Sequence, residues 1–221
     1  GAILCASTDG HLYAFGERSG ERVWKLDTGA PLAAAPVIFG ETIYAGNYAG
    51  QMAAVSVASG HIRWTQRVPG RIVSPPSVDD NHLVVVTRGG GIYALETAEG
   101  SHRWQAHLPA AISSSATLAR DGVVYVAARD GYVRALSMKD GEVVWRHFAG
   151  EPLATTPTIA EGHLLVGGER AGVYAYRQGK AKSVQLASTS ERNHAPPASE
   201  GRRQPAKTDA EASTKTSQPD D

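Results

Sequence analysis

The chain has 221 residues, which is enough for one sizeable domain with a hydrophobic core. Lys and Arg together number 22, and Asp and Glu also number 22, so the formal net charge is zero and no global field favours nucleic acid as a partner. The single cysteine excludes an intrachain disulfide, and no apolar run is long enough to span a membrane.

The chain opens inside an apparent strand. Gly1 is followed directly by an apolar run, and no initiator Met or signal peptide is present. We therefore expect that an N-terminal part of the natural protein, with any targeting segment, precedes this sequence. Cys5 lies in this first strand, where a small core residue is the favoured interpretation and a reactive thiol the alternative.

The first repeat unit covers about residues 3–42 and predicts four short strands. An apolar run at 3–6 is followed by the tight turn Asp9-Gly10 and a second apolar run at 12–15. A glycine turn then leads to a third strand that ends in Trp24. A strand marked by Pro36 is expected to close the unit as its fourth strand.

The same pattern recurs along the chain. Further units are expected at about 43–82, 83–123 and 124–163, and a half unit at 164–178. The four tryptophans of the chain are spaced 40, 40 and 41 residues apart, each a few residues after a glycine; the two sets are Trp24, Trp64, Trp104 and Trp145, and Gly20, Gly60, Gly100 and Gly141. A period of about 40 residues is typical of a repeat array or a propeller.

The residue types of the repeat distinguish a helical solenoid from a β-propeller. The strands are β-branched and aromatic, and glycine interrupts them about every ten residues, which excludes a helical solenoid. We therefore predict an all-β propeller of four-stranded antiparallel blades, of which about 4.5 are present. Each tryptophan is expected to pack against a neighbouring blade as a structural residue and not as part of a binding cage.

The pattern stops near residue 179. Residues 179–221 contain no Trp, Tyr, Phe or Ile and are rich in Ser, Thr, Ala, Pro and mixed charge. Such a composition does not offset its own ordering entropy, so we predict a disordered polar tail. The domain boundary is therefore expected after residue 178.

The repeated sequence resembles the PQQ-like repeat family. The resemblance covers residues 3–178 and is carried by a turn, strand, glycine and tryptophan in fixed order, as in Asp9-Gly10-His11-Leu12-Tyr13-Ala14-Phe15 followed by Gly20-Glu21-Arg22-Val23-Trp24. It implies a seven- or eight-bladed propeller in which the tryptophan docks between blades. The superfamily includes quinoprotein dehydrogenases, a lipoprotein of outer-membrane protein assembly and extracellular propellers of bacterial Ser/Thr kinases, and the fold alone does not choose between them.

The resemblance also implies what an enzyme of this superfamily needs. A quinoprotein dehydrogenase would hold pyrroloquinoline quinone and calcium, with long inserted loops and a vicinal disulfide. Here the units are nearly invariant in length, and the chain has one Cys. The acid pair Asp79-Asp80 lies between units, where a polar turn is the ordinary explanation. The triple serine 113–115 has no His or acidic residue at a fixed spacing that would make it catalytic. The eight His show no metal-ligand spacing. We therefore expect no catalytic, cofactor or metal site, and a quinoprotein dehydrogenase is the least favoured of three functional interpretations.

One surface pattern predicts a partner site. Arg88, Arg129 and Arg170 follow the first strand of successive units at the hairpin turn, where Tyr48 stands in the second unit. Equivalent turns of a propeller project from one rim, so these side chains, with Arg71, are candidate partner-binding residues, against the alternative of independently solvated side chains. The loops between units, at 30–35, 71–75, 110–115 and 151–156, are a second candidate surface.

These observations favour a non-catalytic propeller that acts as a protein-interaction scaffold, as in outer-membrane protein assembly. The alternative is an extracellular sensor or ligand-binding propeller of a bacterial Ser/Thr kinase or receptor. Protein partners and an extracytoplasmic place, periplasmic or associated with the cell envelope, are expected. The oligomeric state stays open.

Overall fold

The structure of the protein, a computed structural model, describes residues 1–170, 172–177 and 180–186. These residues form nineteen strands and no helix. Each strand pairs antiparallel with its neighbours, which confirms the all-β class and the blade architecture predicted from the repeats. Residues 187–221, where the tail was predicted, lie outside the described part of the chain.

The strands form five sheets, numbered here in chain order. Sheet 1 has three strands and sheets 2 to 5 have four each, always in sequence order across the sheet. The bounds are β1 (Ala2–Ala6), β2 (His11–Gly16) and β3 (Arg22–Asp27) in sheet 1; β4 (Val37–Phe39), β5 (Thr42–Gly46), β6 (Gln51–Ser56) and β7 (Ile62–Arg67) in sheet 2; β8 (Ser77–Val78), β9 (His82–Val86), β10 (Gly91–Glu96) and β11 (His102–His107) in sheet 3; β12 (Thr117–Ala119), β13 (Val123–Ala127), β14 (Tyr132–Ser137) and β15 (Val143–Phe148) in sheet 4; and β16 (Thr158–Ala160), β17 (His163–Gly167), β18 (Val173–Arg177) and β19 (Lys180–Leu186) in sheet 5.

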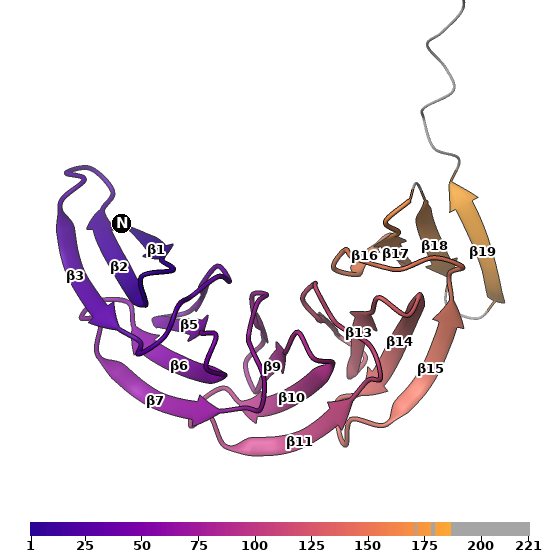
Figure 1. Ribbon diagram of the computed structural model, residues 1–221, viewed down its shortest axis with the longest axis horizontal. Helices are drawn as coiled ribbons and strands as arrows, with labels where there is room; N and C mark the ends of the chain where they lie inside the picture. The colour runs from indigo at the N-terminus through magenta and orange to yellow at the C-terminus, as the bar shows by residue number, and fades with distance from the viewer. Residues whose placement is uncertain (171, 178–179, 187–221) are drawn as a thin grey trace, which may run out of the picture. The chain divides into compact units, whose positions relative to one another are not determined.

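Within the compact unit Gly1–Ser188, the sheets follow one another like the blades of a fan. The strands that carry the tryptophans, β3, β7, β11 and β15, lie along the outer side of this row (Figure 1). The hydrophobic clusters lie between successive sheets: Met52 and Leu83 share one cluster, and Ile92 and Val124 share another. Each pair of sheets therefore buries its central strands in one shared core.

The proline-marked strand belongs to a different sheet from the one expected. It was predicted to close each unit, but β4 pairs with β5, and β8 pairs with β9, so it opens the following sheet. The cause is loop length, because only Gly40 and Glu41 separate β4 from β5, whereas residues 28–36 separate β3 from β4. A two-residue connection forces antiparallel neighbours, and a long one permits a step to the next sheet. The sheets are therefore offset from the sequence units 3–42, 43–82, 83–123 and 124–163.

Each tryptophan of the first three sheets packs on a glycine turn of the next sheet. The indole Nε1 atoms donate hydrogen bonds to the backbone carbonyl oxygens of that turn; the pairs are Trp24 to Val57 at 3.1 Å, Trp64 to Thr97 at 3.2 Å and Trp104 to Met138 at 2.6 Å. A Cβ added to Gly60 would lie 2.7 Å from the ring of Trp24. The glycine of each turn therefore receives the indole of the preceding sheet, at a backbone angle that glycine adopts readily.

Cys5 corrects the expectation of a core residue. Its counterparts Ala45, Val85, Val126 and Val166 are buried, but Cys5 is exposed. Those counterparts lie between two packed sheets, whereas the described residues place no sheet on the corresponding face of β1. The position in the repeat is the same, and its burial depends on the neighbouring sheet.

One further strand, β19, lies beyond the domain boundary expected after residue 178. Strand β19 pairs with β18 and completes sheet 5. The compact unit accordingly extends to Ser188. The sequence pattern ends earlier because β19 carries no tryptophan and no glycine of the repeat.

Candidate functional surface

The hairpin turns and the loops between sheets, predicted as two separate surfaces, form one. In each of sheets 2 to 5, the second and third strands form a long hairpin, and a backbone N–H of its turn donates a hydrogen bond to a carbonyl of the loop that enters the sheet. The pairs are Tyr48 to Pro31, Arg88 to Arg71, Arg129 to Ala111 and Glu169 to Pro152, at 2.9–3.0 Å. We call this combined region the loop surface: turns 47–50, 87–90, 128–131 and 168–170, with loops 30–35, 71–75, 110–115 and 151–156. The four repeated hydrogen bonds hold turns and loops in one arrangement.

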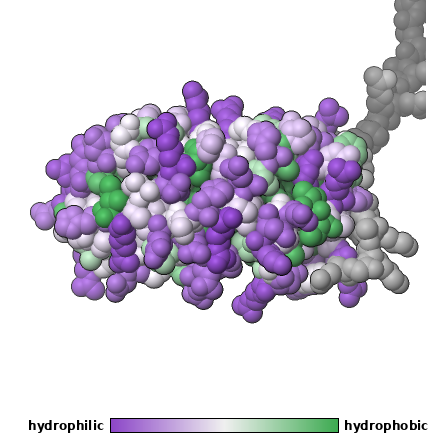
Figure 2. Space-filling view, turned by 90° about the horizontal axis from the view of Figure 1, so that it is seen from below, coloured by the Kyte–Doolittle hydropathy of each residue, from purple (hydrophilic) through white to green (hydrophobic). Residues whose placement is uncertain are grey.

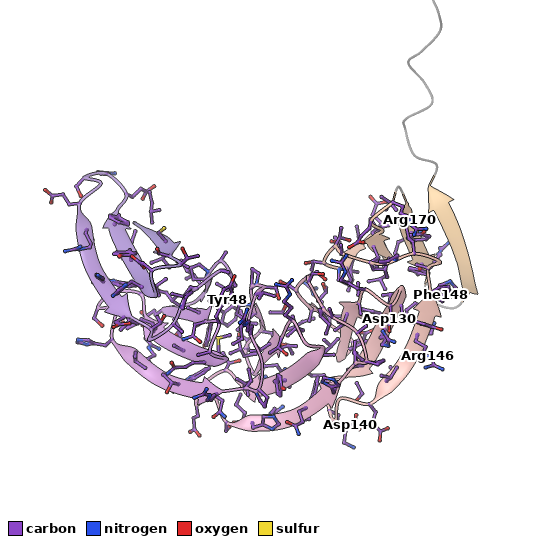
Figure 3. The ribbon with its side chains drawn as sticks, viewed as in Figure 1. Tyr48, Asp130, Asp140, Arg146, Phe148 and Arg170 are labelled. Atoms are coloured by element: carbon purple, nitrogen blue, oxygen red, sulfur yellow. The ribbon has the colours of Figure 1, made fainter. Side chains whose placement is uncertain are left out.

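The expected row of three equivalent arginines is wrong by one residue at its end. Glu169, not Arg170, makes the backbone hydrogen bond that Arg88 and Arg129 make in sheets 3 and 4. The turn between β17 and β18 has five residues and that between β13 and β14 has four, so Arg170 lies one position further along. Arg170 is exposed and still belongs to the loop surface. Figure 3 shows it, with Tyr48, on the inner side of the row of sheets.

Tyr48 and Arg71 come together from different segments. Tyr48 lies in the β5–β6 turn of sheet 2, Arg71 lies in the loop that enters sheet 3, and the guanidinium carbon lies 5.7 Å from the centre of the Tyr48 ring. Both side chains are exposed. The pair forms an aromatic and cationic platform that spans two sheets, of the kind that is enriched at protein interfaces.

The remaining arginines differ in their charge environment. Arg129 pairs with Glu169 of the next sheet, with Nη2 and Oε1 2.6 Å apart, and this pair neutralises its charge locally. Among the described residues, Arg71, Arg88 and Arg170 form no ion pair, and all three are exposed. The positive character of the loop surface therefore lies at these three residues.

Tyrosine hydroxyls donate hydrogen bonds to turn and loop residues in three of the sheets. Tyr13 donates to Asp9 at 2.6 Å, Tyr93 to the carbonyl of Pro69 at 3.1 Å and Tyr174 to Glu151 at 2.7 Å. These tyrosines occupy one register position in the second strand of the long hairpin of sheets 1, 3 and 5. The series was missed from the sequence, although Tyr13, Tyr93 and Tyr174 are spaced 80 and 81 residues apart there, which is two repeat units. Their hydrogen bonds restrain the turn of sheet 1 and the loops that enter sheets 3 and 5.

In sheet 4 the same position carries Arg134, which is 6% exposed. It forms a two-pronged ion pair with Asp130, at 3.1 and 2.5 Å. Burial alone would raise the pKa of Asp130, but the hydrogen bonds from Arg134 and from the backbone of Tyr132 outweigh it, and the pKa lies below its ordinary value. The pair restrains the turn of sheet 4, since Asp130 belongs to that turn and Arg134 to the strand that follows it.

Glu151 serves a similar structural role in sheet 5. It accepts hydrogen bonds from the Tyr174 hydroxyl and from the backbone N–H of Arg170, the latter at 2.6 Å. The hydroxyl, followed by the backbone donor, lowers the pKa of this carboxyl below its ordinary value. The carboxylate thus holds the turn that presents Arg170.

The other polar residues named from the sequence lie apart from the loop tips or in ordinary turns. Asp79 accepts hydrogen bonds from the backbone N–H groups of Asn81 and His82 in the β8–β9 turn. Ser115 donates to the carbonyl of Pro75 of the preceding loop at 2.8 Å. Among the described residues, no group of three His, Cys, Asp or Glu side chains could hold a metal ion. The described residues therefore offer no cluster of carboxylates of the kind that a calcium ion prefers.

A family model described as outer membrane protein assembly factor BamB matches residues 8–214. Among curated relatives, BamB of Alkalilimnicola ehrlichii is 30% identical over 174 residues, covering 74% of this chain and 45% of that protein. BamB of Nitrosomonas eutropha is 34% identical over 87 residues, covering 39% of this chain and 21% of that protein. The chain therefore spans less than half the length of these two relatives.

Solved structures show the same fold. BamB from Moraxella catarrhalis superposes with a TM-score of 0.71 at 18% identity, covering 82% of this chain and 60% of that one. The computationally designed protein Ika8 superposes with a TM-score of 0.73 at 13% identity, covering 82% and 57% of the two chains. At these identities the likeness concerns the fold alone. Within the described residues, no helix is long and apolar enough to cross a membrane.

Proposed function

The chain belongs to the family of outer membrane protein assembly factor BamB, and from this premise we propose that it is a non-catalytic scaffold that binds protein partners during outer-membrane protein assembly. The named relatives are assembly factors. We further propose that it acts on the periplasmic side of the cell envelope, without a bound cofactor. The partners are proteins, and nucleic acid is not among them.

The loop surface is the observation that carries this proposal. Its backbone hydrogen bonds between turn and loop recur from sheet to sheet, so a partner meets a continuous and preorganised surface. Its exposed side chains include the Tyr48–Arg71 platform, and Tyr and Arg are enriched at interfaces. The loop surface is therefore suited to a protein partner with an acidic or extended segment.

The outer side of the sheets is less suited to this role. Figure 2 shows a largely hydrophilic surface there, with separate hydrophobic patches. The exposed apolar residues of the outer strands include Val23, Ile62 and Val144, which lie on different sheets. Apolar side chains scattered in this way are ordinary for a soluble surface and do not indicate docking.

Site-directed photocrosslinking in the cell tests the proposal. A photoreactive amino acid is placed at Arg88 on the loop surface, and at Arg63 on the outer strand β7 as the matched control, since both arginines are exposed. We expect position 88 to crosslink to a protein of the outer-membrane assembly machinery and position 63 not to do so. Equal crosslinks from both positions, or no envelope protein at position 88, would contradict the proposal.

A further inference from the structure

A cavity of about 860 Å³ lies between sheets 4 and 5. Its walls are mainly apolar and aromatic and include Leu118, Tyr125, Trp145, Ile159, Leu164 and Tyr176. The cavity between sheets 1 and 2 has a volume of only about 340 Å³. A volume of several hundred cubic ångströms with mostly apolar walls is the usual form of a small-molecule site.

Among the described residues, an aromatic side chain of sheet 5 contacts the tryptophan that lines the cavity. In the first three junctions, the indole packs on a glycine turn of the next sheet. At this junction the ring of Trp145 meets the ring of Tyr176 edge-on, with centroids 5.6 Å apart. The equivalent strand position carries Val55, Leu95 and Leu136 in sheets 2 to 4. A tyrosine therefore stands where sheets 2 to 4 have an aliphatic side chain.

The hydroxyl of Tyr176 has no hydrogen-bond partner among the described residues, although it is buried. The whole residue is 4% exposed. Burial raises the pKa of this hydroxyl to about 12, so it remains a neutral donor. This hydroxyl is covered by protein atoms, so a molecule in the cavity would contact the ring of Tyr176 and not its oxygen.

The remaining lining residues give the cavity a positive balance. Arg120 and Arg177 contribute two guanidinium groups, Asp121 contributes one carboxylate, and His163 contributes an imidazole. Arg120, Asp121 and Arg177 are exposed, so their charged groups are reached from solvent. An anion carried on an apolar body would meet complementary charge here.

We propose that the cavity between sheets 4 and 5 binds a small amphipathic anion. Its apolar body lies against the aromatic and aliphatic walls, and its anionic group is held by the guanidinium groups of Arg120 and Arg177. This ligand site is separate from the loop surface and does not depend on the scaffold function.

Two dyes with the same body test the proposal on the full chain. 8-Anilino-1-naphthalenesulfonate carries an anionic group, and N-phenyl-1-naphthylamine is its neutral analogue. Both are titrated while emission is followed with excitation of the tryptophans, because Trp145 lines the cavity and transfers energy to a dye bound there. We expect saturable binding of one anionic dye per chain, and energy transfer that falls when Trp145 is replaced by Phe.

Substitutions separate the contributions of the charged and apolar lining residues to dye binding. The double variant Arg120→Ala and Arg177→Ala is expected to weaken the anionic dye about tenfold, the effect of about 1.4 kcal/mol, and to change the neutral dye less than about twofold. Tyr176→Phe removes a hydroxyl that is not reached from the cavity, so it is expected to leave the binding of both dyes unchanged, as is Tyr44→Phe, whose hydroxyl is bonded to the Thr97 carbonyl elsewhere. Ala119→Phe, which narrows the cavity, is expected to weaken both dyes.

Controls exclude adsorption to other apolar surfaces. Phe148 is 53% exposed and does not line the cavity, so Phe148→Ala should leave both dyes unaffected. Far-ultraviolet circular dichroism and thermal unfolding establish that each variant is folded, and if Ala119→Phe does not fold, the arginine double variant decides. Non-saturating binding, or equal loss in the Phe148 and arginine variants, would overturn the proposal.

Discussion

The indole of Trp104 in sheet 3 lies directly on Gly141 in sheet 4. A Cβ added to Gly141 would lie 2.5 Å from Cε3 of the indole, and the indole Nε1 donates to the carbonyl of Met138 three residues earlier. Trp104 is 6% exposed. One glycine turn thus satisfies the polar atom of the indole and covers its face, and this contact joins two sheets.

Replacing Gly141 by Ala should therefore destabilise the protein strongly. The backbone angle φ of Gly141 is +78°, which is unfavourable for Ala, and the added methyl group would also displace the indole. We expect a loss of about 2–4 kcal/mol in the free energy of unfolding, measured by urea denaturation.

Gly20→Ala is the matched control for this prediction. Gly20 has a similar φ of +68°, but nothing lies within 4 Å of an added Cβ. Only the backbone cost of about 1 kcal/mol is expected there. Equal losses in the two variants would show that the indole contact contributes nothing beyond the turn.

The ion pair of Asp130 and Arg134 should make stability depend on pH. The pKa of Asp130 is lowered in the folded state from its ordinary 3.8, so the pair stabilises the protein above about pH 4 and loses this effect as pH falls through the lower folded value. Asp130→Asn should cost about 1–3 kcal/mol at pH 7, because it leaves the buried Arg134 without its counter-charge. The difference from the parent protein should shrink below pH 4, measured by denaturation at each pH. A difference that stays constant down to pH 2 would contradict this assignment.

The Arg129–Glu169 pair should matter more for binding than for stability. Its partners are 51% and 30% exposed, and an exposed ion pair contributes about 0–1 kcal/mol. Glu169→Gln should therefore leave the unfolding free energy nearly unchanged. It frees one positive charge on the loop surface, so association with an acidic partner should become faster at low salt, measured by stopped-flow fluorescence. An unchanged association rate would place the partner away from sheets 4 and 5.

Much of the fold could be predicted from the sequence because the repeat is marked by tryptophan, a rare residue. The spacing of Trp24, Trp64 and Trp104 predicted blades, and antiparallel sheets are found there. The sheet to which the strand after Pro36 belongs could not be predicted from the motif, since pairing depends on the lengths of the loops on either side. Burial of Cys5 could not be predicted either, because it depends on a neighbouring sheet.

The candidate sites were less accessible to sequence reasoning. The repeat pointed to the turns that carry Arg88 and Arg129, but a turn longer by one residue moved Arg170 out of register. The contact of Tyr48 with Arg71 joins residues 23 positions apart and requires two sheets to be placed. The cavity beside Tyr176 requires the same, since its walls come from two successive sheets.

The central claim, that the loop surface binds the partner protein, is tested most directly by removing its unpaired charges. The triple variant Arg71→Ala, Arg88→Ala and Arg170→Ala is compared with Arg22→Ala, Arg63→Ala and Arg67→Ala, which removes the same charge from exposed positions on the outer strands β3 and β7. Affinity for the assembly protein identified by crosslinking is measured by isothermal calorimetry. We predict that the loop-surface variant loses tenfold or more in affinity, about 1.4 kcal/mol, while the outer-strand variant stays within about twofold of the parent. Equal losses, or none, in two folded variants would contradict the claim.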